Sequence, residues 1–303
     1  VIGSNTNDAV ALSGNSLTIN DTTITLSNVS HITYTDPGGS DTINLSGAIP
    51  ATLNLASGNS TVTNSDSSPV YIAASTGKTT INATAGTTII PANSGTGIQQ
   101  LDFAAINISA GAKVVFANSS STLGDYSNHA NRNVAVIDAG GLNIASGGTL
   151  DLGDNDLILN YDPANESATR SLIAGLITTG YGVNKNFSGT GLTSSEANYD
   201  ATQSAGVRAL GWGDNADLGK TSFDGVTLSS PNEMLVKFTY YGDCYLDGTV
   251  DTGPDLSLFA KGFHGQGSGW DFGDFNYDGV TNNLDLSLFA RGLNSGYRTF
   301  GGL

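Results

Sequence analysis

The sequence predicts a mostly β protein: an irregular β-solenoid (β-helix) or β-sandwich body, followed by a small α-helical module. Three observations predict it. Short runs in residues 1–122 alternate apolar residues with Ser, Thr or Asn, which is typical of strands with one buried face. Gly is abundant, at 40 of 303 residues, and turn formers separate the runs. Near the C-terminus, two helix-like stretches each follow a group of closely spaced aspartates.

Five runs carry the strand prediction for a first domain, residues 1–122. They are residues 16–20, 22–26, 41–45, 52–55 and 112–116. Turn sequences such as Asp36-Pro37-Gly38-Gly39 lie between them. No run in this part has helical spacing, so we expect strands throughout the domain.

A weak internal repeat bears on the choice between solenoid and sandwich. Four copies share an apolar residue, Asn, a second apolar residue and then Gly five positions after the first. The copies begin at Leu53, Ile81, Ile106 and Leu142. Their uneven spacing argues against a strict repeat but allows a β-helix with coils of uneven length. A stacked β-sandwich is the alternative.

Residues 123–240 are predicted to form a β-dominated second domain with one or two short helices. Strands are expected at 133–138, 149–161 and 234–240. A helix capped at Asn165 and ended by Gly180 would have one apolar face. That face comprises Ala168, Leu172, Ile173, Leu176 and Ile177. The run Thr193-Ser194-Ser195-Glu196 matches a capping box that opens a second helix.

Charge and cysteine content exclude several classes of protein. The formal net charge is −16, and nucleic-acid binding needs clustered Lys and Arg, so we expect no nucleic-acid partner. The single Cys244 excludes an intramolecular disulfide. No run is long and apolar enough for membrane insertion. Export to the cell surface or the medium, with a signal already removed, is the expected localisation.

The strongest motif lies in a third predicted module, residues 241–303, and runs from Asp274 to Asp285. Ca²⁺ prefers six or seven oxygen ligands, and this loop has oxygen-bearing side chains at positions 1, 3, 5, 9 and 12. Position 7 would contribute its backbone carbonyl, and Gly279 at position 6 permits the sharp turn. The predicted ligands are Asp274, Asn276, Asp278, Val280, Asn282 and Asp285.

Another copy of the motif lies before this one in the sequence, and we call it the first loop and the Asp274–Asp285 copy the second loop. The predicted ligands of the first loop are Asp243, Asp247, Thr249, Asp251 and Asp255. The helix-like stretches 255–262 and 285–292 are nearly identical and 30 residues apart, whereas Asp243 and Asp274 are 31 apart. The first loop therefore has one extra residue, most simply within residues 252–254. Tyr245 occupies its position 3, where an oxygen ligand is expected. Two Ca²⁺ sites are predicted, the one at Asp274–Asp285 the more regular.

This duplicated loop-helix arrangement resembles the dockerin family, including the Asp at the last ligand position. The resemblance covers about a fifth of the chain and implies calcium-dependent docking, in cellulosomes to a cohesin partner. Cellulosomal members of the family recognise cohesin through a Ser/Thr pair late in each loop. In this chain the corresponding positions are Thr252-Gly253 and Asn283-Leu284. Residues 147–243 are similar to the C-terminal region of large secreted β-repeat proteins of bacteria, planctomycetes especially. That likeness implies a surface or matrix role.

No catalytic motif stands out. The three histidines, His31, His129 and His264, lie far apart in sequence and are expected to be surface or turn residues. Three acids cluster near two arginines in sequence, but loop-capping Asp is far commoner than catalytic Asp. They are Asp151, Asp154 and Asp156, with Arg132 and Arg170. Cys244 is expected to be buried and inert, and the aromatic residues around the module to serve packing.

The sequence therefore predicts an extracellular or cell-surface structural protein, not an enzyme. It could be the subunit of a self-assembling fibre or matrix in which calcium orders a C-terminal docking module. One alternative is an adhesin or accessory protein that binds polysaccharide and is anchored through the module to a cohesin-like partner. A third reading is a calcium-dependent polysaccharide lyase or hydrolase on a β-helix.

Overall fold

The computed structural model describes residues 1–73, 77–204 and 206–295. These residues form two compact units. Unit 1 comprises residues 1–91, 101–117 and 135–151, and unit 2 comprises residues 92–100, 118–134 and 152 onward. Residues 296–303 of the predicted C-terminal module lie outside the described residues. The predicted boundaries at 122 and 240 stay a prediction.

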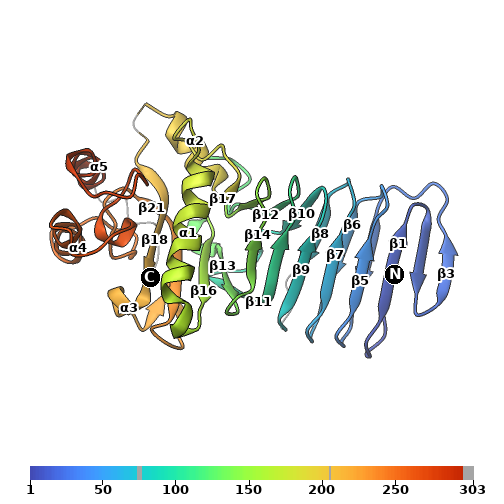
Figure 1. The fold of residues 1–303 in the computed structure, drawn as a ribbon. Coiled ribbons are helices and arrows are strands. Elements are labelled where there is room, and N and C mark those ends of the chain that lie inside the picture. Colours follow the sequence, from blue (N-terminus) through green and yellow to red (C-terminus); the bar gives the residue numbers. More distant parts are fainter. Residues whose placement is uncertain (74–76, 205, 296–303) are drawn as a thin grey trace. The chain divides into compact units, whose positions relative to one another are not determined.

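Unit 1 consists of strands in two sheets, as expected for a β-rich body (Figure 1). One sheet contains β1 (Ala9–Ser13), β2 (Ser16–Ile19), β3 (Thr22–Thr25), β5 (Thr42–Leu45), β7 (Thr61–Asn64), β9 (Thr79–Ala83), β11 (Gln99–Ile108) and β14 (Leu142–Ile144). The other contains β4 (Ile32–Thr35), β6 (Ala51–Asn54), β8 (Val70–Ala73), β10 (Thr87–Ile90), β12 (Lys113–Phe116) and β15 (Thr149–Asp151). β13 (Asn133–Ile137) spans the boundary between the two residue ranges.

From β4 to β12, successive strands alternate between the two sheets, and neighbours within each sheet pair in parallel. This is the winding of a β-solenoid. Thr42 pairs with Thr61 and Thr61 with Thr80, so each of these coils takes 19 residues. The first two hairpins of unit 1, β1–β2 and β2–β3, pair antiparallel.

The internal repeat is confirmed for three of its four copies. Ile81 pairs with Ile106, and Ile106 pairs with Leu142, so coils of uneven length are in register. The copy at Leu53 was wrong, because Leu53 lies in the opposite sheet and pairs with Tyr34 and Ile72. The shorter 19-residue period, visible in Thr42-Ile43-Asn44 and Thr80-Ile81-Asn82, is the stronger signal in the sequence.

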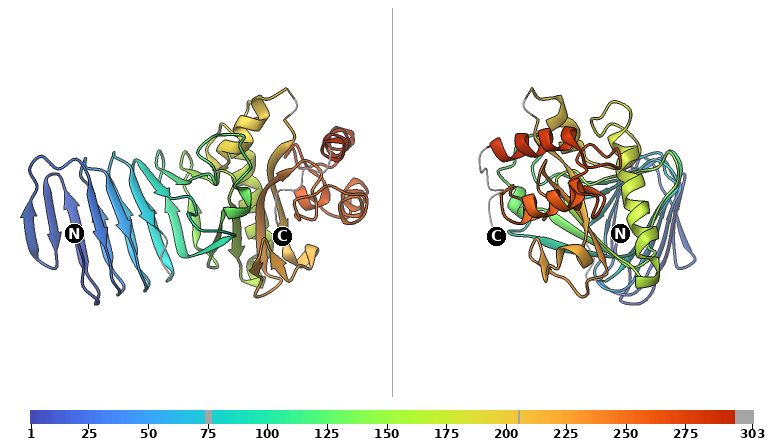
Figure 2. Two further views of the ribbon diagram at one scale, coloured as in Figure 1. Left: turned by 180° about the vertical axis from the view of Figure 1, so that it is seen from behind. Right: turned by 60° about the vertical axis from the view of Figure 1, so that its left-hand side comes forward.

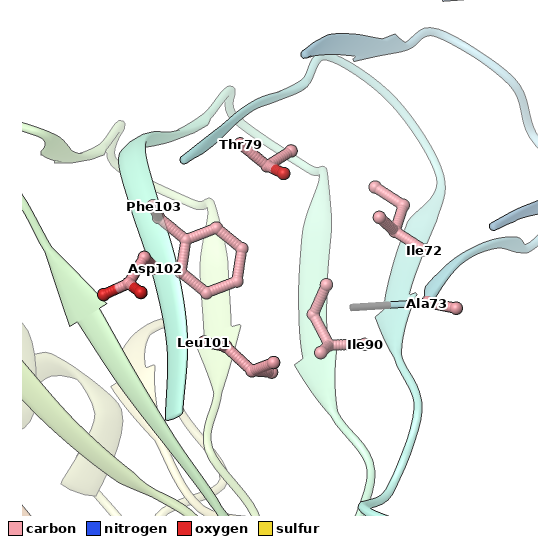
Figure 3. Close-up of a pocket in the computed structure, with 7 residues that line it drawn as sticks. All are labelled: Ile72, Ala73, Thr79, Ile90, Leu101, Asp102 and Phe103. Atoms are coloured by element: carbon pink, nitrogen blue, oxygen red, sulfur yellow. The ribbon is translucent and has the colours of Figure 1, made fainter. Parts of the chain in front are cut away.

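The inner faces of both sheets carry the apolar core of unit 1, including Leu12, Ile43, Leu53, Val62 and Ile81, each at most 1% exposed. A cavity of about 10 Å³ lies in this unit and could hold one water molecule at most. Figure 3 shows the residues that line it, which are mostly apolar: Ile72, Ala73, Thr79, Ile90, Leu101, Asp102 and Phe103.

Unit 2 is built on β16 (Asp156–Asn160), β21 (Glu233–Tyr240) and β18 (Arg208–Asp214), which pair antiparallel in that order. Its other strands are β17 (Gly191–Thr193), β19 (Ser222–Phe223) and β20 (Val226–Thr227). Its α-helices are α1 (Glu166–Tyr181), α2 (Ser195–Thr202), α3 (Asn215–Leu218), α4 (Pro254–Phe263) and α5 (Asn283–Asn294). Short 3₁₀ turns occur at η1 (His129–Asn131), η2 (Pro163–Asn165) and η3 (Trp270–Phe272).

The predicted helices exist, but their ends differ in detail. Asn165 precedes α1 without a side-chain cap, and the buried stripe of α1 is Ile173, Ile177 and Gly180. The N-cap of α2 is Ser194, one residue later than the capping box predicted, because its hydroxyl accepts the amide of Ala197. Within the described residues, no helix is long and apolar enough to cross a bilayer.

Candidate metal centre

The first and last predicted ligands of the second loop organise its backbone. Asp274 accepts the amide N–H groups of Asp278 (3.1 Å) and Gly279 (2.9 Å). Asp285 accepts those of Phe275 (2.9 Å), Asn276 (3.2 Å) and Asn282 (3.0 Å). Both carboxylates are buried, at 7% and 0% exposure. The loop is therefore wound around two desolvated acidic groups.

The first loop repeats the same hydrogen-bond pattern. Asp243 accepts the amides of Asp247 (3.0 Å) and Gly248 (2.9 Å), and Asp255 accepts those of Tyr245 and Asp251, both at 2.8 Å. The counterparts of Asp251 and Asp255 in the second loop are Asn282 and Asp285. The extra residue thus lies between Asp251 and Asp255, where the sequence predicted it.

The intermediate predicted ligands turn toward one another within each loop. In the second loop, Asn276 Nδ2 donates to Asp278 Oδ2 (3.0 Å) and Asn282 Nδ2 donates to the carbonyl of Val280 (3.2 Å). In the first, Asp247 accepts both the amide and the hydroxyl of Thr249. Tyr245 at position 3 offers its ring to the Lys220 ammonium, 3.9 Å from the ring centre.

Burial of these acids is electrostatically unfavourable as the side chains stand. Burial and the neighbouring carboxylates raise the pKa of Asp274 to about 6 and that of Asp255 to about 8. Burial likewise raises the pKa of Asp243 to about 6. Among the described residues, no basic side chain forms an ion pair with these three acids.

These groups nevertheless do not converge as a preformed cluster. In the described part of the chain, no three His, Cys, Asp or Glu side chains lie together as a metal-binding group. The donor set consists of carboxylate, amide and carbonyl oxygens, which suit Ca²⁺. The loops thus present the right atoms in equivalent positions, with several of them engaged in hydrogen bonds within the loop.

The two loop-helix repeats pack as a symmetric pair, and the helices α4 and α5 are both visible in Figure 2. A Cβ added to Gly262 in α4 would lie 1.8 Å from the carbonyl oxygen of Phe272, just before the second loop. A Cβ added to Gly292 in α5 would lie 1.6 Å from that of Tyr241, just before the first loop. Phe259 and Phe289, at equivalent positions, are in contact with ring centres 5.3 Å apart. Each helix therefore packs against the residues that precede the loop of the other repeat.

Gly292→Ala is accordingly expected to destabilise unit 2 by about 1–3 kcal/mol, because the added methyl group overlaps a backbone oxygen that cannot move aside freely. Gly175→Ala is the control. Gly175 lies inside α1 with open space at its Cβ position, so alanine should stabilise the helix by about 0.5–1 kcal/mol. Urea denaturation of both variants checks the prediction, and a neutral Gly292→Ala would contradict the close packing.

Residues 241–295 also pack against strand β18 of the same unit. The fourth residue of each loop, Leu246 and Tyr277, has a positive φ (56° and 59°) and a buried side chain. The Tyr277 hydroxyl donates to the carbonyl of Leu210 in β18 (2.9 Å). A Cβ on Gly211 of β18 would lie 2.7 Å from Trp270 and 2.8 Å from Leu246. The glycine lets the loops approach the strand, a role that sequence reasoning missed.

The aromatic residues near the loops mostly serve packing, as expected. Tyr240, Tyr241, Phe272, Phe275 and Tyr277 are all at most 7% exposed. Cys244 is fully buried, and burial raises the pKa of its thiol well above the ordinary value, which agrees with the prediction of an inert residue. These side chains form a core that contains both loops.

The predicted acidic and histidine candidates are brought together only in part: Asp154 contacts His129, and Arg132 pairs with Asp156 and donates to the carbonyl of His129. His129 was expected at the surface, but it is 1% exposed and its Nδ1 lies 3.2 Å from Asp154. Burial lowers the pKa of His129 to about 4, so its ring is neutral near pH 7. Asp151 pairs instead with Lys113 in unit 1. His31 and His264 are exposed, as predicted.

The two arginines named with these acids, Arg132 and Arg170, form ion pairs with further acids that the sequence did not single out. Arg132, 5% exposed, pairs with Asp156 and with Asp224, and Lys237, 2% exposed, pairs with Asp224 as well. Arg170 of α1 pairs with Asp217 and with Asp271 of η3, which lies between the two loops. Long-range ion pairs leave no periodic signal in a single sequence, which is why they were missed.

No protein-family model, no curated protein and no solved structure matches this chain. The chain's own geometry is therefore the basis for any functional assignment.

Proposed function

We propose that this chain is an extracellular or cell-surface structural protein that self-associates, in which Ca²⁺ orders a dockerin-like pair of loops at the C-terminal end. The observation that carries the proposal is the repetition of one hydrogen-bond pattern in both loops. Each repeat surrounds buried carboxylates that form no ion pair with a basic side chain among the residues the structure describes. A divalent cation would neutralise the negative charge of these carboxylates, whose oxygens would take the place of water molecules in the hydration shell of the ion.

In the second loop the ion would be held by Asp274, Asn276, Asp278, Asn282 and Asp285, with the carbonyl of Val280. In the first it would be held by Asp243, Asp247, Asp251 and Asp255, with Thr249. Asn276 and Asp278 bond to each other, and a cation between them would displace that hydrogen bond. Asp285 and Asp255 would retain backbone contacts that fix the loop while binding the ion.

Calcium removal tests the proposal. Binding free energy in such loops adds directly to folding free energy, so EGTA should lower the melting temperature of unit 2. Asp278→Ala should melt at a lower EGTA concentration than Asp251→Ala, because the second loop has the fuller donor set. Differential scanning calorimetry with matched Mg²⁺ samples separates specific binding from ionic strength. An unchanged thermal profile in EGTA would end the calcium assignment.

The β body supports the structural role. β3 forms one end of its sheet, and all four of its residues, Thr22–Thr25, are exposed. Edge strands without Lys or Pro can pair with another chain. The stacked coils of unit 1 would suit a spacer or building block. Self-association, rather than catalysis, is the activity that these features favour.

A further inference from the structure

On the outer face of the β1–β14 sheet in unit 1, three neighbouring rows consist of short, uncharged side chains, mostly hydroxyls and amides, and the charged groups of this face, Asp102 and the Lys78–Asp138 ion pair, lie outside these rows. The strand pairings align these side chains in rows that run across the strands. We call this surface the hydroxyl–amide face. One row is Thr23, Thr18, Ala11, Asn44, Thr63, Asn82, Asn107 and Asn143, and a second is Ala9, Thr42, Thr61, Thr80 and Ala105.

A third row continues the pattern at the end of β1 and just beyond the ends of the following strands. Ser65 and Thr84 are hydrogen-bonded through their hydroxyls (2.6 Å), and the amide of Ser46 bonds back to the preceding coil. Its members are Ser13, Ser46, Ser65, Thr84 and Ser109. None of the side chains in the three rows is charged or aromatic, although the whole chain carries a net charge of −16.

The side chains of the first row hold one another in place. Asn143 Nδ2 donates to Asn107 Oδ1 and Asn107 Nδ2 donates to Asn82 Oδ1, both at 2.9 Å. Asn143 Nδ2 also donates to the carbonyl of Gly140 (3.2 Å), whereas the ladder uses one of the two N–H groups of Asn107. The face is thus a pre-ordered array of donors and acceptors, and little side-chain entropy is lost when a partner binds it.

The outer face of the opposite sheet is different. It presents Tyr71, Ile89 and Val115 in one row and carries the Lys113–Asp151 ion pair. Such a mixed surface is ordinary for a soluble protein. The uniform composition of the hydroxyl–amide face is therefore not a general property of unit 1.

We infer that the hydroxyl–amide face is the surface through which two copies of this chain associate, face to face. This inference rests on the proposed self-association and names its surface. Hydroxyls and amides both donate and accept, so the same face is complementary to itself, as a twofold interface requires. Two acidic chains can approach here without like-charge repulsion. The face has no aromatic ring for a sugar to stack on and no charge to attract a charged partner.

The size of the face sets the strength of the contact. Eight strands about 4.8 Å apart and three rows about 6.7 Å apart cover roughly 600 Å². A stable interface usually buries about 800 Å² per partner, so one pair of faces alone binds weakly. Association should therefore depend strongly on concentration and be reinforced when further contacts repeat along an assembly.

A charge-swap experiment tests the inference. Asn44 is exposed and central in its row, so Asn44→Lys and Asn44→Glu should fold. Sedimentation velocity with Ca²⁺ should show each variant alone associating at least tenfold more weakly than the unchanged protein. An equimolar mixture of the two should regain association, because opposite charges then face each other. Thr33→Lys and Thr33→Glu, exposed on the opposite sheet, are the controls and should change nothing.

The outcomes separate this inference from the proposed function. If the unchanged protein associates and the Asn44 variants associate equally well, the face is not the interface, while self-association stands. If the unchanged protein stays monomeric at every concentration with Ca²⁺, the proposed function itself fails. Retention on a neutral polysaccharide that Asn44→Lys abolishes, with association unaffected, would assign the face to a glycan and overturn the inference. Circular dichroism confirms that each variant is folded.

Discussion

Arg132→Met is expected to lower the free energy of unfolding of unit 2 by about 3–5 kcal/mol. Arg132 is 5% exposed, and its guanidinium pairs with Asp156, which is fully buried, and with Asp224 at 2.8 Å. It also donates to the carbonyl of His129 (3.0 Å). Methionine fills much of the same space but leaves the Asp156 carboxylate without its closest cation. A buried unpaired charge is among the most destabilising single changes.

Both tryptophans, Trp212 and Trp270, lie in unit 2, so tryptophan fluorescence during urea denaturation reports on this unit. Lys185→Met removes a positive charge from an exposed position and should change stability by no more than about 0.5 kcal/mol. Adding Asp156→Leu to Arg132→Met should recover part of the loss, because no buried charge is then left unpaired. Equal stability of Arg132→Met and Lys185→Met would show that the buried network contributes nothing.

Tyr277→Ala is expected to destabilise unit 2 by about 3–5 kcal/mol, the usual effect of removing a buried aromatic side chain. The Tyr277 ring lies 4.8 Å from that of Tyr181, 5.8 Å from that of Phe187 and 5.6 Å from that of Trp270. Its hydroxyl donates to Leu210. This one side chain therefore joins the second loop to α1 and β18.

The same fluorescence measurement checks this prediction, since Trp270 is a direct neighbour of Tyr277. Tyr277→Phe keeps the ring and should lower the free energy of unfolding by only about 1–3 kcal/mol, because the carbonyl of Leu210 then loses its hydrogen-bond donor. Val280→Ala, in the same loop but 60% exposed, is the matched control and should be nearly neutral. A Tyr277→Ala variant as stable as Val280→Ala would show that the loops fold independently of β18.

The strand prediction succeeded where one face of a strand is buried. Runs such as Thr42-Ile43-Asn44-Leu45 alternate in sequence because Ile43 and Leu45 point into the core and their neighbours point outward. The repeats at Ile81, Ile106 and Leu142 were detectable for the same reason, since stacked coils place equivalent residues in register. The Leu53 copy failed because a strand of either sheet carries the same alternation.

The loops were predictable because their chemistry is local. Asp274, Gly279 and Asp285 act within twelve residues, and the backbone hydrogen bonds of both loops follow from spacing alone. Their charge state was not predictable, because it depends on burial against β18 and α1. The same holds for His129, which is neutral because it is buried, and the residues next to it in sequence do not specify that burial.

The amino-acid sequence by itself determined the β-rich class, the strands and helices, and the paired acidic loops, because periodicity, turn residues and the spacing of the acidic residues act between neighbours in the chain. Only the tertiary structure decided which sheet each strand joins, which charges are buried together, and how the loops pack against Gly211. It also created the hydroxyl–amide face, since the members of its rows come from separate coils. These features depend on contacts between distant segments, and burial changes the energy of a charge or a hydrogen bond in ways that neighbouring residues do not encode.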